Sequence, residues 1–236
     1  MAQELADKRT PVTVQQMADA MYTAWCRYFN SPPAHKSIYV LLAQWALETG
    51  RGAQMHNFNV GNVKARPNGE YDFQYFACNE RLRTATAKQM QSADPKTARI
   101  TRTNSDGTSW IWFYPKNTGC CFRAFEQLDD GVFDYLCMMI NHQMFKRAWP
   151  AVLAGSPQQF SHLLKQAGYY TADEQTYTHT MVLLFNEFSK TVVLPDPPTF
   201  TSEEQQEFRN TVTRNLQMTA AEESTVCRGE PDDKDI

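Results

Sequence analysis

The chain has 236 residues, of which 42% are hydrophobic and 21% charged, and its formal net charge is -3. This composition supplies enough apolar side chains for a core that needs no metal ion or disulfide to fold. The slight negative charge argues against a nucleic-acid-binding protein with a large basic surface, and no apolar run of about 18 residues predicts a membrane span.

The chain begins with a polar segment, Met1 to Arg9, that contains acidic side chains. This segment lacks the apolar middle of a secretory signal. We therefore expect a protein that is synthesised in the cytoplasm without a cleaved signal peptide.

Two helices are predicted in the first fifty residues. Thr13 can cap a helix that runs to about Phe29. A second helix fits His35 to Glu48, and Gly50 can stop it in the left-handed cap position. Apolar residues of the second helix recur at steps of three and four: Ile38, Leu41, Leu42, Trp45 and Ala46.

The helical period gives way to strands and loops between residues 57 and 121. Residues 71–78 alternate in polarity, are rich in aromatic side chains and predict a strand. Residues 98–103 and 108–114 flank Asp106-Gly107, which predicts a hairpin turn. On the second arm of this hairpin, alternation places three aromatic residues on one side: Trp110, Trp112 and Tyr114.

Helical periodicity returns after residue 127. Three helices are predicted near residues 128–140, 157–168 and 171–188. The proline-rich stretch at residues 194–198 predicts a stiff linker. It leads into an acidic tail, since residues 201–236 contain nine acidic and four basic side chains, a net charge of -5.

This order of elements predicts an α+β fold, mainly α, with a small antiparallel β insertion between the second and third main helices. We expect residues 1–195 to form one domain, with the β region at about 66–121. Residues 196–236 would then form a proline-rich linker and an acidic C-terminal appendage that is partly helical or disordered.

The six cysteines lack the paired spacing of a zinc site. Cys26 and Cys137 lie in helical apolar patterns and are expected to be buried free thiols. Cys78 and the Cys120-Cys121 pair lie in loop or strand segments. A disulfide among these three remains open if the protein works outside the cytosol.

Glu48 is the most informative residue of the chain. It follows the apolar residues Trp45, Ala46 and Leu47 and stands where the second helix ends. A carboxyl group walled by apolar side chains tends to have a raised pKa, and a protonated carboxyl near neutrality is what a general acid requires. The alternative is an ordinary solvated glutamate at a helix end.

The surroundings of Glu48 favour the catalytic interpretation. Ala46-Leu47-Glu48-Thr49-Gly50-Arg51-Gly52, followed by Asn59-Val60-Gly61-Asn62-Val63-Lys64-Ala65, resembles the lysozyme-like peptidoglycan glucosaminidases of glycoside hydrolase family 73. In that family a helix ends in Glu-Ser/Thr-Gly-x-Gly, and Asn-x-Phe-Gly-Ile-Lys-Ala follows. This chain lacks the phenylalanine before the glycine.

Two later segments resemble the same family and keep its order along the chain. Cys121-Phe122-Arg123-Ala124-Phe125 is similar to a segment that leads into a helix with Asp-Tyr, here Asp134-Tyr135. Ala167-Gly168-Tyr169-Tyr170-Thr171, with Tyr177 after it, is similar to an Ala-Gly-Tyr-Ala-Thr-Asp-x-x-Tyr segment. Together the segments cover most of residues 36–190, so the resemblance implies a lysozyme-like helical domain.

The resemblance implies that Glu48 protonates the glycosidic oxygen. The family's second carboxylate lies in its β region, in a strand that is not clearly recognisable in this chain. Glu80 is the first candidate, with Asp72 and Glu70 as alternatives. Its role would be that of a base or of a stabiliser of an oxocarbenium-like transition state.

Further site residues follow from the resemblance and from their chemistry. Tyr177 resembles the family's active-site tyrosine, although a core tyrosine on an apolar stripe would look the same. Other residues are expected to contact the sugar or else to serve the local structure: Asn57, Asn59, Asn62, Tyr169 and Trp112.

The function implied is hydrolysis of β-1,4 bonds in the peptidoglycan glycan strand, with the activity of an endo-N-acetylglucosaminidase. Two carboxyl groups and water suffice for that reaction, so no cofactor and no metal ion are expected. The alternatives are a lytic transglycosylase or muramidase of the same clan, and a non-catalytic glycan-binding module.

The expected partner is the glycan strand, and neither nucleic acid nor a membrane is expected. Without a signal peptide, the protein would reach the cell wall or periplasm by non-classical export or after lysis. If it is a secreted effector, we also expect a cognate immunity protein.

Overall fold

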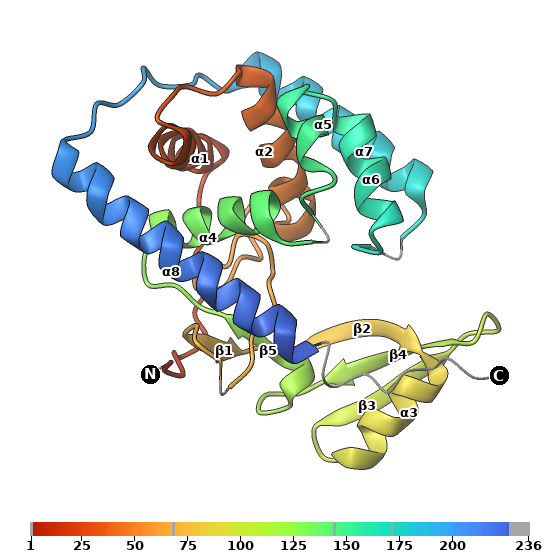
Figure 1. Ribbon diagram of the computed structural model, residues 1–236. Coiled ribbons are helices and arrows are strands. Elements are labelled where there is room, and N and C mark those ends of the chain that lie inside the picture. The colour runs from red at the N-terminus through yellow and green to blue at the C-terminus, as the bar shows by residue number, and fades with distance from the viewer. Residues whose placement is uncertain (1, 68, 144, 171, 227–236) are drawn as a thin grey trace. The chain divides into compact units, whose positions relative to one another are not determined.

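The computed structural model describes residues 2–67, 69–143, 145–170 and 172–226. The chain divides into two compact units, one of residues 1–12 and 48–131 and one of residues 13–47 and 132–236. The first unit contains the strands and the second most of the helices (Figure 1). The elements confirm the predicted α+β class, mainly α, with small antiparallel sheets.

The helical unit begins with α1 (Val14–Phe29), which starts where the sequence predicts. The Thr13 hydroxyl accepts a hydrogen bond from the Gln16 backbone N–H, and the Gln16 side chain accepts one from the Thr13 N–H. This capping box satisfies two backbone donors that the helix itself cannot pair. The side chains that α1 buries include Met17, Met21 and Trp25.

Helix α2 (His35–Thr49) forms the centre of the helical unit's core. Its side chains from Ile38 to Ala46 are buried at every position, including Gln44. The predicted end is confirmed within one residue, because Gly50 follows with a φ of 57°. A φ of that sign suits glycine, which has no Cβ to clash.

The remaining helices of this unit follow residue 127. They are α4 (Leu128–Asn141), α5 (Trp149–Leu153), α6 (Pro157–Gln166), α7 (Glu174–Thr191) and α8 (Ser202–Val226). Ser156 caps α6, and Pro157 occupies its first turn as predicted. Phe208 of α8 packs on Phe133 and Tyr28, and the Arg27 guanidinium lies 5.0 Å from the Phe208 ring centroid.

The predicted linker and appendage are described as far as residue 226. The segment from Val192 to Thr201 contains no regular element, and α8 makes the following stretch helical to Val226. Residues 227–236, which include Cys227, lie outside the described part of the chain. The domain boundary at residue 195 stays a prediction.

The β unit holds two small antiparallel sheets and one helix. Strand β1 (Phe73–Tyr75) pairs with β5 (Cys121–Arg123), preceded by the 3-10 turn η1 (Thr118–Cys120). The second sheet has the order β2-β4-β3 and consists of β2 (Cys78–Arg83), β4 (Thr108–Phe113) and β3 (Ala98–Thr103). The predicted hairpin is therefore confirmed, with Gly107 at a φ of 80° in its turn.

Two predictions for this region were wrong. Residues 71–78 do not form one strand, because β1 and β2 belong to different sheets and the chain changes sheet at Phe76 and Ala77. The Phe76 ring stacks at 4.0 Å on Phe122 of β5, a contact that no local pattern reveals. Helix α3 (Thr84–Ala93) was not predicted, since Ala87 is its one buried residue.

Helix α3 covers one face of the three-stranded sheet. Ala87 and Met90 pack with Ile111 and Phe113 of β4, and Figure 1 shows α3 alongside β3. The burial of β4 alternates, so that Ser109, Ile111 and Phe113 face α3. Trp110 and Trp112 therefore lie on the opposite face, as the alternation predicted.

The five cysteines within the described residues are free thiols: Cys26, Cys78, Cys120, Cys121 and Cys137. Cys26 and Cys137 are buried in helices, as predicted. The disulfide that the sequence left open among the other three is not formed. No helix among the described residues is long and apolar enough to cross a membrane.

Candidate active site

Glu48 occupies the last turn of α2 and is half-buried. The next residue, Thr49, is fully buried and organises the turn after the helix. The Thr49 hydroxyl accepts a hydrogen bond of 2.9 Å from the Gly52 N–H, and its carbonyl accepts one of 3.0 Å from the Gln54 N–H. The threonine of the Glu-Thr-Gly-Arg-Gly motif therefore holds the turn that follows the candidate acid.

The backbone conformation explains why this motif contains two glycines. Gly50, Arg51 and Gly52 have φ angles of 57°, 58° and 82°. Three consecutive left-handed residues are costly for side chains with a Cβ, so glycine at two of the three positions lowers that cost. The motif thus allows the chain to turn sharply directly after Glu48.

Asn62 brings the second motif back to the end of the helix. Its side-chain amide donates a hydrogen bond of 3.1 Å to the Glu48 carbonyl oxygen. A carbonyl in the last turn of a helix has no partner within the helix, and Asn62 supplies one. The amide group predicted to bind sugar therefore uses its donor to position the backbone of Glu48.

Asn59 holds the loop through its side-chain amide, and its predicted contact with sugar stays a prediction. The residue is 1% exposed. Its amide nitrogen donates to the carbonyl oxygens of Val63 and Arg123 at 2.9 and 3.0 Å, and its oxygen accepts from the Val63 N–H at 2.8 Å. Two of these bonds close the loop on itself, and the third ties the loop to β5.

Lys64, the lysine of the second motif, connects the loop to the candidate second carboxylate. Its ammonium lies 2.8 Å from the Glu80 carboxylate, donates to the Gly119 carbonyl at 2.6 Å and stands 3.9 Å from the Phe122 ring centroid. Glu80 is in β2, on the sheet face that packs on α3. The two motif segments and Glu80 are thus joined through Asn62 and Lys64.

Cys78 lies beside this ion pair. Its thiol is 3.5 Å from the Lys64 nitrogen and 3.8 Å from a Glu80 oxygen. Burial raises the pKa of Cys78 to about 11, against the opposing effect of the Lys64 ammonium. The thiol is therefore neutral at physiological pH and not suited to act as a nucleophile.

The alternative carboxylates are differently placed. Asp72 accepts a hydrogen bond of 2.7 Å from the Gln3 N–H and so fastens the N-terminal segment to the sheet. Glu70 is exposed and has no ion pair with a described residue. Of the three candidates, only Glu80 is held by a residue of the motif, so we keep it as the first choice.

Trp112 lies on a surface that we call the outer sheet face: Asn79, Arg81, Arg99, Arg102, Trp110 and Trp112. Cross-strand pairing places Trp112 between Asn79 and Arg99. It places Trp110 between Arg81 and Arg102 in the same way. The two indoles are half-buried and their arginine neighbours are partly or fully exposed. Aromatic rings and guanidinium groups in alternation suit a ligand with sugar rings and anionic groups.

Tyr169 and Tyr177 belong to the helical unit. The Tyr169 hydroxyl accepts a hydrogen bond of 2.8 Å from the amide of Gln44, whose oxygen accepts one of 2.5 Å from the Tyr135 hydroxyl. Tyr177 is 7% exposed and stacks on Tyr170 with ring centroids 3.7 Å apart. Within this unit Tyr177 has the burial of a core residue, and its predicted catalytic role stays a prediction.

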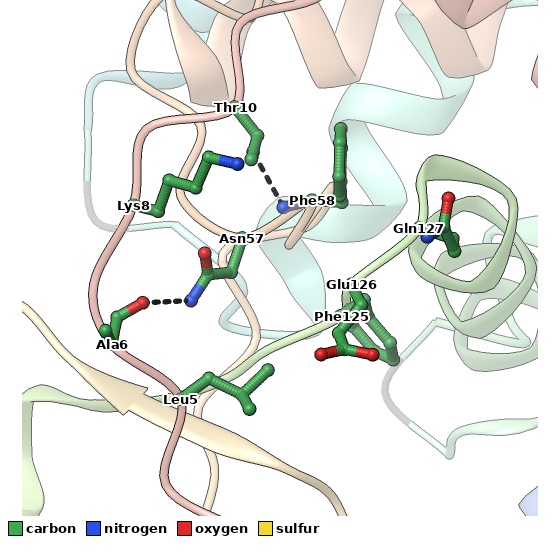
Figure 2. Close-up of a pocket in the computed structure, with 9 residues that line it drawn as sticks. All are labelled: Leu5, Ala6, Lys8, Thr10, Asn57, Phe58, Phe125, Glu126 and Gln127. Atoms are coloured by element: carbon green, nitrogen blue, oxygen red, sulfur yellow. Dashed lines mark hydrogen bonds between the residues drawn. The ribbon is translucent and has the colours of Figure 1, made fainter.

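Asn57 lines a pocket of the β unit. Its amide nitrogen donates to the Ala6 carbonyl at 2.9 Å, and Phe58 lies next to it on the pocket wall (Figure 2). Lys8 and Glu126 also line this pocket, and sequence reasoning did not identify them. Across the described residues, no group of three or more His, Cys, Asp or Glu side chains could hold a metal ion.

No protein-family model and no curated protein matches the sequence. Among solved structures, the chain is similar to a C-terminally truncated glycoside hydrolase domain of FlgJ from Salmonella typhimurium, with 16% identity and a TM-score of 0.42. That match covers 75% of this chain and 99% of the other.

Two further solved structures are similar to the chain. One is a peptidoglycan hydrolase mutant from Sphingomonas sp. A1, with 18% identity, a TM-score of 0.45 and coverage of 73% of this chain and 92% of the other. The other is the catalytic domain of the autolysin Auto from Listeria monocytogenes, with 16% identity, a TM-score of 0.42 and coverage of 78% and 89%.

Proposed function

We propose that the chain hydrolyses β-1,4 glycosidic bonds in the glycan strand of bacterial peptidoglycan, with Glu48 as the general acid. The observation that carries the proposal is the closed loop after α2. Thr49 and the left-handed residues 50–52 turn the chain, and Asn62 then binds the Glu48 carbonyl. The residues of the two motifs thus fix the position of one glutamate.

The proposed reaction uses two carboxyl groups. Glu48 donates its proton to the oxygen of the scissile bond, the bond from that oxygen to the sugar carbon breaks, and positive charge develops on the ring. Glu80, held by the Lys64 ammonium, stabilises that charge or takes a proton from the attacking water. The water oxygen becomes the new hydroxyl on the sugar carbon and keeps one of its two protons. The other proton returns to Glu48, directly or by way of Glu80 and solvent.

The outer sheet face would bind the glycan outside the reacting bond. Trp112 offers a half-buried ring for stacking on a sugar, and Tyr114 lies beside it with ring centroids 6.3 Å apart. Arg99 and Arg102 offer exposed cations to the carboxylates that a wall polymer carries. In this proposal Trp112 contributes to binding and not to the chemical step.

The type of cleavage is part of the proposal and is tested on the wild-type protein. Purified peptidoglycan is digested, and the soluble products are analysed by mass spectrometry before and after borohydride reduction. An endo-N-acetylglucosaminidase gives products that end in a reducible N-acetylglucosamine. Reducible N-acetylmuramic acid identifies a muramidase, and an anhydro end identifies a lytic transglycosylase. Binding to the wall without soluble products would leave only the glycan-binding module.

A further inference from the structure

The β unit contains a pocket of 440 Å³ that the reaction proposed above does not use. Three segments far apart in the sequence form it: the N-terminal segment with Leu5 and Lys8, the motif loop at Asn57 and Phe58, and the stretch beginning at Phe125 (Figure 2). Its volume is within the range of pockets that bind small molecules, which is about 300–1,000 Å³.

Backbone hydrogen bonds hold these three segments together. The Asn57 N–H donates to the Lys8 carbonyl at 2.8 Å, and the Phe125 N–H donates to the Asn57 carbonyl at 2.9 Å. The Phe58 N–H donates to the Thr10 hydroxyl at 2.8 Å. The pocket wall is therefore preformed in the absence of a ligand, and a preformed wall lowers the entropic cost of binding.

The loop at this wall has an unusual backbone. Asn57 and Phe58 have φ angles of 39° and 47°. Positive φ at two consecutive residues that are not glycine is costly, and such conformations cluster at ligand sites. Gly131 accommodates this wall, because a Cβ there would lie 2.0 Å from the Phe58 carbonyl oxygen.

The pocket carries two exposed charged side chains of opposite sign, Lys8 and Glu126. Elsewhere in the unit, some opposite charges meet in the pairs Lys64–Glu80, Lys116–Glu4 and Arg81–Asp106. The Lys8 ammonium and the Glu126 carboxylate line one pocket, yet neither has an ion pair or side-chain hydrogen bond with any residue that the structure describes. The Asn57 side-chain oxygen likewise has no donor among those residues.

The remaining lining is apolar, with Leu5, Phe58 and Phe125. A cation, an anion and an amide oxygen on the wall of one apolar-lined pocket suit a short zwitterionic peptide better than a neutral sugar. A carboxylate of the peptide would pair with Lys8, an ammonium with Glu126, and a peptide N–H would donate to the Asn57 oxygen.

We propose that this pocket binds the peptide stem that branches from the glycan strand, through one of its carboxylates and the side-chain amine of its diamino acid. This inference rests on the proposed function for the choice of polymer. It adds a site that recognises the peptide while the Glu48 region acts on the sugar. Lys8 and Glu126 are binding residues in this proposal and take no part in the chemical step.

The test is calorimetric titration of the full chain with the synthetic stem tripeptide L-Ala-γ-D-Glu-diaminopimelate, which carries no sugar. We expect saturable binding that weakens at least tenfold in Lys8→Met and in Glu126→Gln. Two exposed residues outside the pocket, changed in Lys88→Met and Glu207→Gln, serve as matched controls and should bind as the wild type does. Acetylation of the side-chain amine should weaken wild-type binding and leave no further loss in Glu126→Gln.

Absence of tripeptide binding, or equal binding in all four variants, overturns the proposal. Solubilisation of the cell wall is measured on the same preparations, so the two proposals fail separately. Wall hydrolysis without tripeptide binding removes only the pocket's role. Tripeptide binding without wall hydrolysis supports the pocket and removes the catalytic function. With both present, Lys8→Met should raise KM on intact wall and leave KM on peptide-free glycan unchanged.

Discussion

The loop from Glu48 to Lys64 and the outer sheet face use their polar side chains in opposite ways. In the loop, Thr49, Asn59 and Asn62 bind backbone groups of the loop and its neighbours. On the outer sheet face, the half-buried Trp112 pairs across the strands with the exposed Arg99. The polar side chains of the motif therefore mainly hold the backbone around Glu48. The side chains accessible to a ligand lie on the outer sheet face, outside the motif.

A large effect is expected at Glu80, which the Lys64 ammonium joins to the loop. Glu80→Gln removes the negative charge proposed to stabilise the transition state, so we expect at least a hundredfold slower wall hydrolysis, or about 2.7 kcal/mol. Lys64→Met is the comparison variant, because it removes the same ion pair and leaves the carboxylate. It should slow hydrolysis less than Glu80→Gln does. Equal losses in both variants would make Glu80 an anchor for the loop and nothing more.

A slightly smaller effect is expected on stability when the loop loses Asn59. Asn59→Ala removes three hydrogen bonds and leaves the Val63 N–H without its partner, while the Val63 and Arg123 carbonyls keep the Arg123 N–H and the Gln74 amide. We expect the free energy of unfolding to fall by about 2 kcal/mol. Asn57→Ala, which loses one hydrogen bond to Ala6, should cost about 1 kcal/mol. Urea denaturation measures both. A stable Asn59→Ala variant with impaired glycan binding would contradict the structural role assigned to this residue.

On the outer sheet face, the expected effect concerns binding and not stability. Trp112→Ala should raise KM for wall fragments about tenfold and leave kcat within twofold. A tenfold change corresponds to about 1.4 kcal/mol, the upper part of the range for one aromatic contact. Leu183→Ala, at an exposed apolar residue of α7, is the control. A fall in kcat with an unchanged KM would place Trp112 in the chemical step instead.

The smallest effect is a pH dependence at Cys78. Because its pKa is raised to about 11, the fraction of thiolate at pH 8 is about a hundredfold lower than for a thiol with a pKa of 9.0. Alkylation by iodoacetamide should therefore be slow at pH 8 and accelerate up to about pH 11. The rate is measured in the Cys227→Ser variant. The other described cysteines, apart from Cys78, are buried, so the reaction reports on Cys78. Fast alkylation at pH 8 would show that Lys64 outweighs burial at this site.

The parts of the fold that could be predicted from the sequence are those set by local caps and turns. Thr13, Gly50 and the Asp106-Gly107 turn act through neighbouring backbone atoms, and the elements that they bound were predicted closely. Helix α3 was missed because its side chains are mostly exposed and show no apolar period. The break between β1 and β2 was missed because it depends on Phe76 stacking on Phe122, a contact across 46 residues.

Most of the predicted site residues lie in segments that resemble a known family, whereas the charged residues of the pocket lie outside those segments. Glu48 and Lys64 lie in the motifs, and the structure connects both to their neighbours through Asn62 and Glu80. Lys8 and Glu126 are isolated charges in polar stretches, and only the fold brings them to one pocket. The side-chain amide of an asparagine can form hydrogen bonds with the backbone of a loop or with a sugar. The sequence therefore could not separate the role of Asn59 from that of Asn57.

The most direct test of the central claim is the release of soluble fragments from purified peptidoglycan by Glu48→Gln. The free energy of unfolding is measured on the same preparation, with Glu207→Gln as the matched control. We expect Glu48→Gln to unfold as the wild type does and to release no fragments above the protein-free background, while Glu207→Gln releases them at the wild-type rate. Fragment release by Glu48→Gln at the wild-type rate would contradict the account.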